Sequence, residues 1–403
     1  MFVIGSAKRV MKSDWRTEGV PFYRTREIVR LSEQGHVDND LFISTSLYEE
    51  IRRQYGVPME NDIMLTAVGT IGIPYVVKKD DCFYYKDASV LCLSNVFDVS
   101  PEYFQYVLLS SLLRDQMFSA SKGTTVDTIT IERASEYKTL LPPLREQYRI
   151  VNEIKRIFSI IDCAESNLRI LNNLIHKAKS KILELAMQGK LVPQDPTDEP
   201  AAEMLKRINP NAKILTDFQH YQFWATTTLD SVCNFERGIT FPAEAKEFEQ
   251  TNENIACLRT SNIQDVVDLS SIWYIDRVYL KNNTKKILKV GDIIMSTANS
   301  KELVGRSVIV RSLPYDMTFG GFVTVIRTTV LNPDFLLLFF KYQFLRGKLS
   351  KIASQTTNIA NLNTKILSSI EISIPPIRTQ DRIVKRVHKL YSVLDKIEAS
   401  LQS

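Results

Sequence analysis

The chain repeats part of its own sequence, and this internal repeat limits the possible folds more than any other feature. Residues 141 to 168 align without a gap on residues 374 to 401, and each copy opens on two prolines followed by an amphipathic stretch. A repeat of this kind indicates two copies of one structural unit. The identical pairs include Pro142/Pro375, Pro143/Pro376, Arg145/Arg378, Gln147/Gln380, Arg149/Arg382, Ile150/Ile383, Val151/Val384, Asp162/Asp395, Glu165/Glu398 and Leu168/Leu401.

Weaker similarity extends upstream of the two proline pairs. Residues 100 to 113 resemble residues 332 to 345, because each stretch begins with a helix-capping Ser or Asn, followed by Pro, an acid and an apolar run. Residues 60 to 72 likewise resemble residues 290 to 302. The repeating unit is therefore a globular segment of roughly 140–150 residues, a size typical of one domain, followed by a helix that begins at Pro-Pro.

Apolar residues in both helices follow a spacing that alternates between four and three. A seam with a mean period of about 3.5 residues over this length is typical of a coiled coil. The alternative is a surface helix packed on its own domain, but such a helix usually has a wider apolar stripe and is shorter. The prolines begin the first helix and Gly189 ends it, which predicts a rod of roughly 45 residues and about 65 Å. The seam comprises Ile150, Ile154, Ile157, Ile161, Leu168 and Leu171 in the first helix and Ile383, Val387, Leu390, Leu394 and Ile397 in the second.

The remaining segments mix short β-type runs with single helices. Residues 82 to 94, 306 to 312 and 322 to 329 favour strands, whereas residues 191 to 220 are rich in Pro and Asp, as is typical of a linker. We therefore predict a mixed α/β (α+β) fold, with two similar domains joined by two long helices. The predicted boundaries are domain 1 at 1 to 141, a central spacer helix at 142 to 190, the linker at 191 to 220, domain 2 at 221 to 373 and a C-terminal spacer helix at 374 to 403.

Composition is that of a soluble globular protein. Hydrophobic residues make up 44% of the sequence and charged residues 24%. The longest apolar run, residues 335 to 340, is far shorter than the roughly 18 residues needed to span a bilayer. The N-terminus lacks the layout of a signal peptide, so a cytoplasmic location is expected. The formal net charge of +5 permits a polyanionic partner without requiring one.

The residue patterns needed for catalysis or metal binding do not occur in the sequence. The five cysteines form no CxxC pair and lie at no metal-ligand spacing from the four histidines, so we interpret them as reduced and mostly buried. There is no glycine-rich loop for S-adenosylmethionine, no Asn/Asp-Pro-Pro-aromatic tetrapeptide, no P-loop, no GxSxG elbow and no nuclease-like grouping of acids. The sequence therefore predicts a chain that is not an enzyme and binds no cofactor or metal itself.

Polar loop residues recur at matching positions of the two units and are the candidate binding residues. Residues 22 to 29 resemble residues 257 to 264, and each stretch places Arg-Thr after a short strand. Arg can pair with guanine and Asn or Gln with adenine, so matching loops with different side chains suggest one scaffold with two readouts. An ordinary solvated loop is the alternative for any single residue. The candidates are Arg24, Thr25, Arg26, Thr66, Thr70, Lys122, Thr124, Arg259, Thr260, Asn262, Ser296, Asn299, Lys301, Gln355, Thr356 and Asn358.

The helix start Pro-Pro-(Leu/Ile)-Arg-x-Gln-x-Arg-Ile-Val resembles a motif of the specificity subunit of Type I DNA restriction-modification systems. Residues 182 to 208, ILELAMQGKLVPQDPTDEPAAEMLKRI, carry the same resemblance, and residues 5 to 29 are similar to the opening of its target recognition domains. The resemblance covers essentially the whole chain. It implies two target recognition domains of α/β character, joined by two long helices that form an antiparallel coiled coil with a pseudo-twofold internal repeat.

The same resemblance implies how the chain works and with which partners. Each recognition domain would bind one half of a bipartite, asymmetric site in double-stranded DNA, and the helices would set the spacer between the halves. Two methylation subunits would dock on the helices, with restriction subunits in the full complex. S-adenosylmethionine for adenine-N6 methylation, and ATP with Mg²⁺ for restriction, would be used by those partners rather than by this chain.

Two departures from a perfect repeat accompany the resemblance. The first domain has no counterpart of residues 223 to 234, and the second helix stops before it matches residues 171 to 188 of the first. Two other function classes stay open: an enzyme with an unrecognised site, which would modify or cut DNA alone, and a coiled-coil tether that binds proteins and has negligible affinity for DNA. We expect instead a salt-sensitive affinity for DNA that becomes sequence-selective with the methylation partner.

Overall fold

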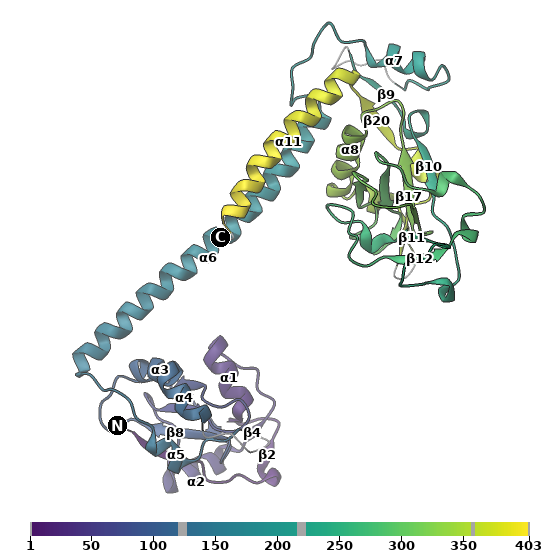
Figure 1. The fold of residues 1–403 in the computed structure, drawn as a ribbon. Helices are drawn as coiled ribbons and strands as arrows, with labels where there is room; N and C mark the ends of the chain where they lie inside the picture. The colour runs from purple at the N-terminus through teal and green to yellow at the C-terminus, as the bar shows by residue number, and fades with distance from the viewer. Residues whose placement is uncertain (1, 120–126, 216–222, 356–358, 402–403) are drawn as a thin grey trace. The chain divides into compact units, whose positions relative to one another are not determined.

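A computed structural model describes residues 2–119, 127–215, 223–355 and 359–401. The chain divides into two compact units, unit 1 at Met1–Glu165 and unit 2 at Ser166–Ser403. One helix, α6 (Leu144–Met187), begins in unit 1 and ends in unit 2 (Figure 1). Within the described residues, no helix combines the length and the apolar character needed to cross a membrane.

Unit 1 combines short strands with helices that follow and cover them. Its strands are β1 (Val3–Ser6), β2 (Trp15–Arg16), β3 (Val20–Tyr23), β4 (Phe42–Ile43), β5 (Ile63–Thr66), β6 (Pro74–Val76), β7 (Tyr84–Tyr85) and β8 (Val90–Ser94). Its helices are α1 (Thr25–Gln34), α2 (Thr45–Gln54), α3 (Pro101–Leu109), α4 (Ser111–Ser119), α5 (Ile131–Glu136) and the first part of α6, with a 3₁₀ turn at Lys12–Asp14.

Two sheets organise unit 1. An antiparallel sheet has the order β1-β8-β5-β6, and a second sheet has the order β2-β4-β3-β7, in which β3 and β7 are parallel. Both faces of β5 are covered: Ile63 and Leu65 belong to the apolar cluster beneath α3, and Met64 belongs to the cluster beneath α1. Because successive side chains of a strand point to opposite faces, this double burial explains the unbroken apolar run Ile-Met-Leu.

Unit 2 repeats this plan with a longer set of elements. Its strands are β9 (Ala225–Thr228), β10 (Asn234–Arg237), β11 (Asn254–Leu258), β12 (Trp273–Asp276), β13 (Ile293–Ser296), β14 (Ala298–Asn299), β15 (Ser307–Ile309), β16 (Met317–Phe319), β17 (Val323–Arg327), β18 (Ser354–Gln355), β19 (Ala360–Asn361) and β20 (Glu371–Ile374). Its helices are α7 (Ala201–Ile208), α8 (Pro333–Leu345), α9 (Lys348–Ile352), α10 (Thr364–Ser368) and α11 (Ile377–Ser400), with 3₁₀ turns at Leu229–Ser231, Ala243–Ala245, Thr260–Asn262, Arg277–Leu280 and Thr284–Lys286.

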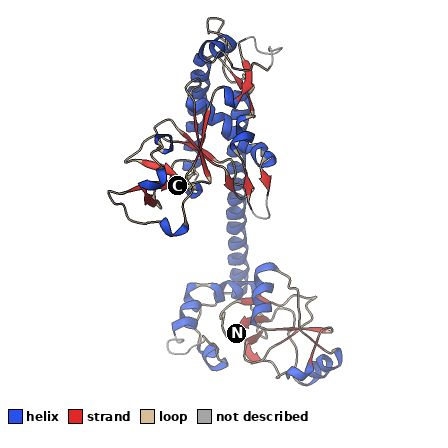
Figure 2. Cartoon of the chain, turned by 90° about the vertical axis from the view of Figure 1, so that its right-hand side faces the viewer, coloured by secondary structure: helices blue, strands red, loops and turns tan. Residues whose placement is uncertain are grey.

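The two units agree in the register of their strands. The sheet β10-β17-β13-β15 has the same order and the same antiparallel pairing as β1-β8-β5-β6, and the parallel pair β11–β16 matches β3–β7. Figure 2 shows strands flanked by helices in each unit. Val3 pairs with Ser94 just as Asn234 pairs with Arg327. The fold is therefore mixed α/β in two similar copies, as the internal repeat predicted.

The long helices α6 and α11 lie side by side in unit 2 and run antiparallel. The Lys179 ammonium contacts both Asp395 and Glu398 at 2.8 Å, and the Tyr391 hydroxyl donates to the Lys179 carbonyl. Ile383 and Val387 are fully buried beside them, in a cluster that also contains Leu183 and Ala186 of α6. In Figure 1, α11 lies along the C-terminal part of α6 only.

The seam before that point is not covered in the described part of the chain. Ile157 and Ile161 are each 45% exposed, and Leu168 and Leu171 are exposed by more than a third. The reason is the position of α11, whose last turns already lie beside Lys179. The predicted coiled-coil seam is thus buried at its C-terminal end and left open along its middle.

The repeated Pro-Pro motif forms the joint between each globular segment and its helix. In unit 1 the Gln147 side chain accepts a hydrogen bond from the Ser100 backbone N–H and donates to the Pro142 carbonyl, both at 2.9 Å. In unit 2, Gln380 makes the same two bonds, from the Asn332 N–H and to the Pro375 carbonyl, again at 2.9 Å. Both glutamines are buried, and each one satisfies a free N–H at the start of a helix.

Removing this joint should destabilise its unit. We expect Gln380→Ala to lower the free energy of unfolding of unit 2 by about 2 to 4 kcal/mol, because the Asn332 N–H and the Pro375 carbonyl lose their buried partner. Lys385→Ala, on the exposed side of the same helix, should change it by less than about 0.5 kcal/mol. Urea unfolding followed by hydrogen exchange in α8 distinguishes the two, and equal effects would contradict the role of the joint.

Candidate nucleic-acid interface

The two Arg-Thr strings begin with the same local geometry. In unit 1 the Arg24 backbone N–H donates to the Glu27 carboxylate at 2.9 Å, which closes the start of α1. In unit 2 the Arg259 backbone N–H donates to Asn262 Oδ1, also at 2.9 Å, at the start of the turn Thr260–Asn262. Part of the recurrence therefore has a structural cause, because the residue three positions on caps the helix start.

The arginine side chains of unit 1 are held by carboxylates. The Arg24 guanidinium contacts Glu27 at 3.0 Å and Asp40 at 2.9 Å, and Arg26 contacts the same two acids. Glu27 is buried, whereas the side chain of Asp40 is 68% exposed. Glu27 thus anchors the arginines to the unit, whereas Asp40 contacts them from an exposed position.

The pKa of Glu27 reflects this anchor. Burial alone would raise that pKa, but hydrogen bonds from the Arg24 side chain and backbone and from Arg26 outweigh burial and leave it below the ordinary 4.5. A carboxyl group whose pKa is lowered on folding contributes stability above its unfolded pKa, and this stability is lost as the pH falls through the folded value.

We therefore expect the cost of Glu27→Gln to depend on pH. At neutral pH the substitution should destabilise unit 1 by about 1 to 3 kcal/mol, because it removes a buried anion that accepts bonds from two arginines. The difference from the parent chain should shrink below pH 4.5, where the parent carboxylate is itself being protonated. Urea midpoints across that range, followed by hydrogen exchange in α1, give the measurement, and a pH-independent cost would contradict it.

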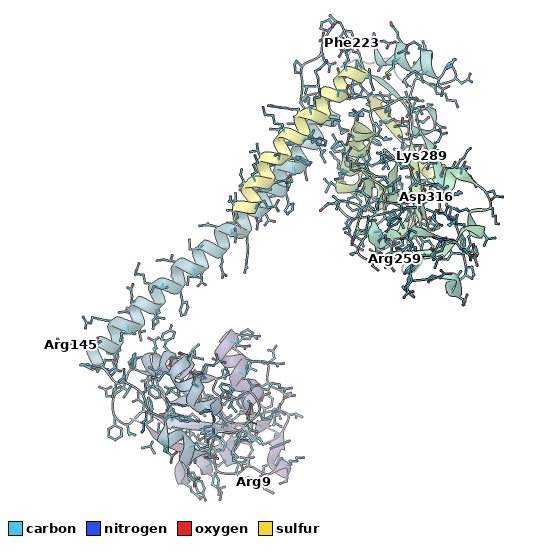
Figure 3. All side chains as sticks on the ribbon, viewed as in Figure 1. Arg9, Arg145, Phe223, Arg259, Lys289 and Asp316 are labelled. Atoms are coloured by element: carbon cyan, nitrogen blue, oxygen red, sulfur yellow. The ribbon has the colours of Figure 1, made fainter. Side chains whose placement is uncertain are left out.

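Unit 2 holds the equivalent arginine in a different way. The Arg259 guanidinium lies 4.3 Å from the centre of the Trp273 ring and donates to the Ser271 hydroxyl at 2.6 Å. The Lys246 ammonium lies over the same ring at 4.3 Å. Two cations on one half-buried aromatic ring make a site where positive charge and a flat apolar surface meet. Figure 3 shows Arg259 at the end of unit 2 opposite Phe223.

Three candidate loops of unit 1 follow from the sequence, at residues 24–26, 66–70 and 121–125, and the third lies outside the described residues. The Thr25 hydroxyl of the first loop donates to the Val68 carbonyl of the second at 3.3 Å. The second loop bonds the segment after the third, because the Gly69 N–H donates to the Asp127 carbonyl and Val68 forms a bridge with Thr128. We call this set, residues 24–27, 66–70 and 127–128, the loop face of unit 1.

Unit 2 has an equivalent loop face at residues 259–264, 296–306, 354–355 and 359–361. Arg306 donates to the Gln264 side chain at 2.7 Å, which joins the first and second loops. The second loop pairs with the third through β14 and β19, with Asn299 opposite Ala360. Each unit therefore brings its first two loops together with the described residues beside the third, 127–128 in unit 1 and 354–355 with 359–361 in unit 2.

The individual candidates differ in their exposure. Thr66, Asn262 and Ser296 are buried, and their side chains bond within the unit: Thr66 accepts from the Ile73 N–H, Asn262 donates to the Asp268 and Ser271 carbonyls, and Ser296 accepts from Asn299. The exposed candidates among the described residues are Arg26, Thr70, Lys301 and Gln355, with Arg24, Thr25, Arg259, Thr260 and Asn299 half-buried. Lys122, Thr124, Thr356 and Asn358 lie outside the described residues.

Sequence reasoning missed several residues that belong to the two loop faces or contact them. Trp273 lies under Arg259 and Lys246, Arg306 bonds Gln264, and Asp40 bonds Arg24. Trp273 lies at the start of a strand, within an apolar run of the sequence. In the described residues, no group of three or more His, Cys, Asp or Glu side chains could hold a metal ion.

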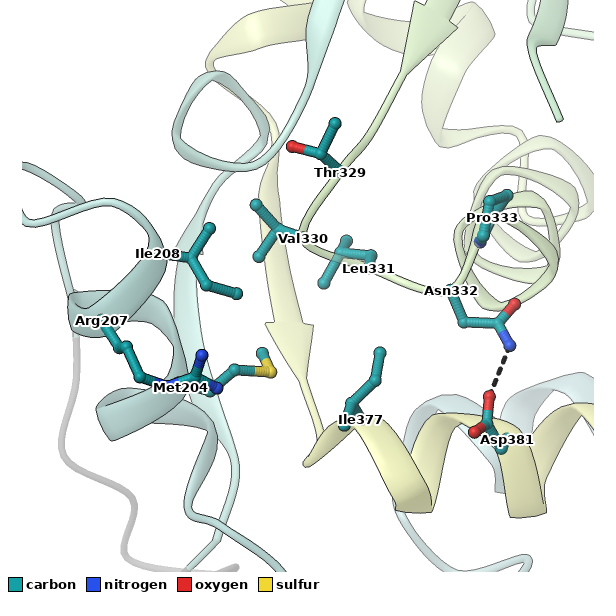
Figure 4. A pocket seen from close by; sticks show the side chains of 10 residues that line it. All are labelled: Met204, Arg207, Ile208, Thr329, Val330, Leu331, Asn332, Pro333, Ile377 and Asp381. Carbon is teal, nitrogen blue, oxygen red and sulfur yellow. Dashed lines mark hydrogen bonds between the residues drawn. The ribbon is translucent and has the colours of Figure 1, made fainter.

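A separate hollow of about 370 Å³ lies in unit 2 between α7, the start of α8 and α11 (Figure 4). Asn332 bonds Asp381 across it at 2.6 Å, and Met204 and Ile208 line the opposite side. None of the candidate residues lines this hollow. It belongs to the joint between linker and helix rather than to the loop face.

The repeated fold defines the class first: a protein of two similar α/β modules, each followed by a long helix that begins at Pro-Pro. The family model described as "Type I restriction modification DNA specificity domain" matches residues 1–173 and 222–403. The chain therefore belongs to the family of Type I restriction-modification specificity proteins.

Two relatives and one solved structure give the degree of similarity. The chain is 23% identical over 298 residues to the EcoKI specificity subunit of Escherichia coli strain K12, covering 73% of this chain and 59% of that protein. It is 26% identical over 251 residues to the Escherichia coli EcoAI specificity subunit, covering 55% of this chain and 40% of that protein. A chain from a structure of a type I R-M system is similar in fold, with a TM-score of 0.53, 20% identity and coverage of 86% of this chain and 80% of that one.

Proposed function

We propose that this chain is the DNA sequence-recognition subunit of a Type I restriction-modification complex, and that each loop face contacts one half of a bipartite, asymmetric site. One observation carries the proposal: two copies of one scaffold bring equivalent loops together, residues 24–27 with 66–70 in unit 1 and 259–264 with 296–306 in unit 2, yet they hold different side chains there. Arg24 is paired with carboxylates, and Arg259 is stacked on Trp273. Two half-sites with different bases require different hydrogen-bonding side chains, and the two equivalent loop faces carry different ones.

The proposal also assigns catalysis to other subunits. No cofactor would bind this chain, and methylation subunits would use S-adenosylmethionine while restriction subunits use ATP with Mg²⁺. The open part of the α6 seam supports docking of the methylation subunits, because isolated apolar side chains are ordinary on a surface but a continuous stripe marks an interaction site. The stripe comprises the seam residues Ile157, Ile161, Leu168 and Leu171, all exposed by more than a third.

Substituting the stacked arginine tests the assignment of the unit 2 loop face. With the methylation partner present, Arg259→Ala should weaken binding to the cognate site about 5- to 100-fold, as expected for the loss of one good base contact, and should relax selectivity in one half-site only. Lys289→Ala removes an exposed cation from elsewhere in unit 2 and should change affinity much less. Competition binding with systematically varied duplexes measures both. Equal losses for the two variants would assign Arg259 a nonspecific role.

The experiment that tests the whole proposal is methylation mapping by long-read sequencing in cells that express the chain with its methylation subunit. We expect one bipartite motif with two unlike halves and a fixed gap. The purified chain alone should neither cut nor methylate DNA, and its affinity for DNA should fall steeply with salt. Modification by the chain alone would support an enzyme instead, and negligible DNA affinity of the assembled complex would support a protein-binding tether.

A further inference from the structure

The loop face of unit 1 has an exposed carboxylate beside its two arginines. Asp40 lies between α1 and β4, and its side chain is 68% exposed. The Arg24 Nη2 group donates to it at 2.9 Å, and the Arg26 Nη2 group donates to both of its oxygens at 3.3 Å. A carboxylate opposes the binding of a polyanion such as DNA. Its position on this face therefore requires an explanation other than affinity.

The strands of unit 1 fix the position of Asp40. The next residue, Leu41, is buried, and its carbonyl accepts from the Phe22 N–H of β3 at 2.9 Å. Strand β4 then begins at Phe42, which pairs with Pro21 of β3. Because β3 also leads into the Arg-Thr string, the same strand pairing places the carboxylate and the arginines together. The contact is thus a consequence of the fold rather than of flexible surface side chains meeting.

The attachment of the arginines to unit 1 does not depend on Asp40. The buried Glu27 already accepts from Nε of Arg24 at 3.1 Å and from Nε of Arg26 at 2.8 Å. Asp40 adds contacts to the Nη2 groups only. Ion pairs with an exposed carboxylate contribute little to folding. The main effect of Asp40 is therefore on the charge and the hydrogen-bond donors of the loop face.

With Asp40 in place, two guanidinium groups face two carboxylates. Desolvation raises the pKa of Asp40, but the hydrogen bond from Arg26 and the charges of Arg24 and Arg26 outweigh it and hold that pKa below the ordinary 3.8. The carboxylate is therefore charged at neutral pH. The Nη1 groups of both arginines form no hydrogen bond within the described residues. The cluster thus keeps free donors in fixed positions while its charges cancel.

Unit 2 does not balance its cations in this way. The equivalent Arg259 lies on the Trp273 ring and bonds the Ser271 hydroxyl, and Lys246 lies over the same ring. Neither cation forms an ion pair with a carboxylate in the described part of the chain, and Asn262 stands where unit 1 has Glu27. The charge balance is therefore a property of unit 1 and not of the shared scaffold.

We propose that Asp40 is a specificity-determining residue of unit 1, which lowers the affinity of Arg24 and Arg26 for phosphates and leaves their Nη1 groups for base acceptors. This inference rests on the proposed function of the loop face. Contacts to phosphates depend on net charge and are the same for every sequence, whereas base acceptors in the major groove are uncharged and differ between sequences. Cancelling the charge of a donor cluster therefore penalises non-cognate DNA more than the cognate half-site.

Asp40→Asn tests the proposal in the full chain assembled with its methylation subunit. Asparagine keeps the size and an accepting oxygen but removes the charge. We expect affinity for a non-cognate duplex to rise about 3- to 10-fold at low salt, with a salt dependence steeper by about one phosphate contact. Affinity for the cognate duplex should change by less than about twofold, so the ratio of the two affinities should fall. Fluorescence anisotropy titrations over a series of salt concentrations measure both.

Two matched variants separate this role from a general charge effect. Asp38→Asn removes the same charge from an exposed position two residues away that has no contact with either arginine, and it should leave the affinity ratio near that of the parent. Asp40→Glu keeps the charge and should retain most of the parent ratio. The Tm of all three variants should stay near that of the parent, because each change is at an exposed side chain.

Three results overturn the proposal. The first is an equal change of the affinity ratio in Asp40→Asn and Asp38→Asn. The second is a loss of selectivity in Asp40→Glu as large as in Asp40→Asn, which would exclude charge as the cause. The third is a weaker cognate complex with unchanged non-cognate affinity, which would mean that Asp40 itself contacts a base. A parent complex without sequence-selective binding would instead contradict the proposed function, so the two failures are distinguishable.

Discussion

Inserting about four helix-forming residues into α6 between Ser159 and Ile160 is expected to widen the gap between the two half-sites while leaving the bases of both halves unchanged. Four residues add about 6 Å of rise and a net rotation of about 40°. One DNA base pair adds about 3.4 Å and about 36°. The length change therefore matches nearly two base pairs and the rotation matches one, so we expect the spacer to grow by about one to two base pairs.

The insertion point is chosen from the contacts of α6. The first turns are tied to α3 by the Lys155–Glu102 ion pair and the Phe158–Tyr106 ring contact, and the last turns are tied to α11 through Lys179. Residues 159–171 are exposed, so an insertion after Ser159 alters helix length without breaking either attachment. Methylation mapping of the modified complex gives the spacer directly.

An insertion of the same length in the exposed turn at Lys79 and Asp80 serves as the control and should leave the spacer unchanged. A helix insertion that abolishes modification in all sequence contexts would indicate loss of partner docking, and the α6 insert would then be moved by one turn. An unchanged spacer in an active complex would show that the helix does not measure the gap.

The architecture could be predicted from the sequence because it depends on regular patterns. The internal repeat predicted two similar units. The Pro-Pro pairs, followed by apolar residues with a period of about 3.5 residues, predicted the long helices. The role of Gln147 and Gln380 could not be predicted, since each bonds the backbone of a residue 47 or 48 positions away, Ser100 or Asn332. Contacts across such separations are fixed by the tertiary fold and leave no periodic signal.

The location of the candidate site stays a prediction, and the structure shows which of its residues reach the surface. The first two loops meet in each unit, yet Thr66, Asn262 and Ser296 face inward and satisfy buried backbone or side-chain groups. Polar loop residues have this second use because buried N–H and C=O groups require partners. Trp273, by contrast, was not singled out from the sequence, and its half-buried ring lies under two cations.

The element that covers the apolar seam of α6 could not be predicted from the sequence either. The heptad pattern required a partner for the whole seam, and the fold supplies α11 only for its C-terminal part. The apolar pattern of one helix predicts that its apolar surface is covered, but the pattern does not identify the helix or subunit that covers it. The proposed function assigns the open stripe to a partner subunit.

Replacing residues 221 to 373 with the corresponding segment of another specificity subunit is expected to change one half-site completely and to leave the other half and the spacer as they were. The reason is that the loop face of unit 2 lies entirely within this segment, whereas α6 and the loop face of unit 1 lie outside it. The reciprocal replacement of residues 1 to 141 should change only the other half.

The joint explains why such a replacement can fold. Gln380 stays in the host and binds the backbone N–H of residue 332, not its side chain, so any donor residue except proline can supply that bond. The host linker is held by the host helix through Asp198, Thr379 and Arg382, which the replacement does not touch. Methylation mapping then separates the outcomes. A new base pattern in both halves would mean that the units do not read DNA independently, and an unchanged motif in an active chimera would place recognition outside the loop face.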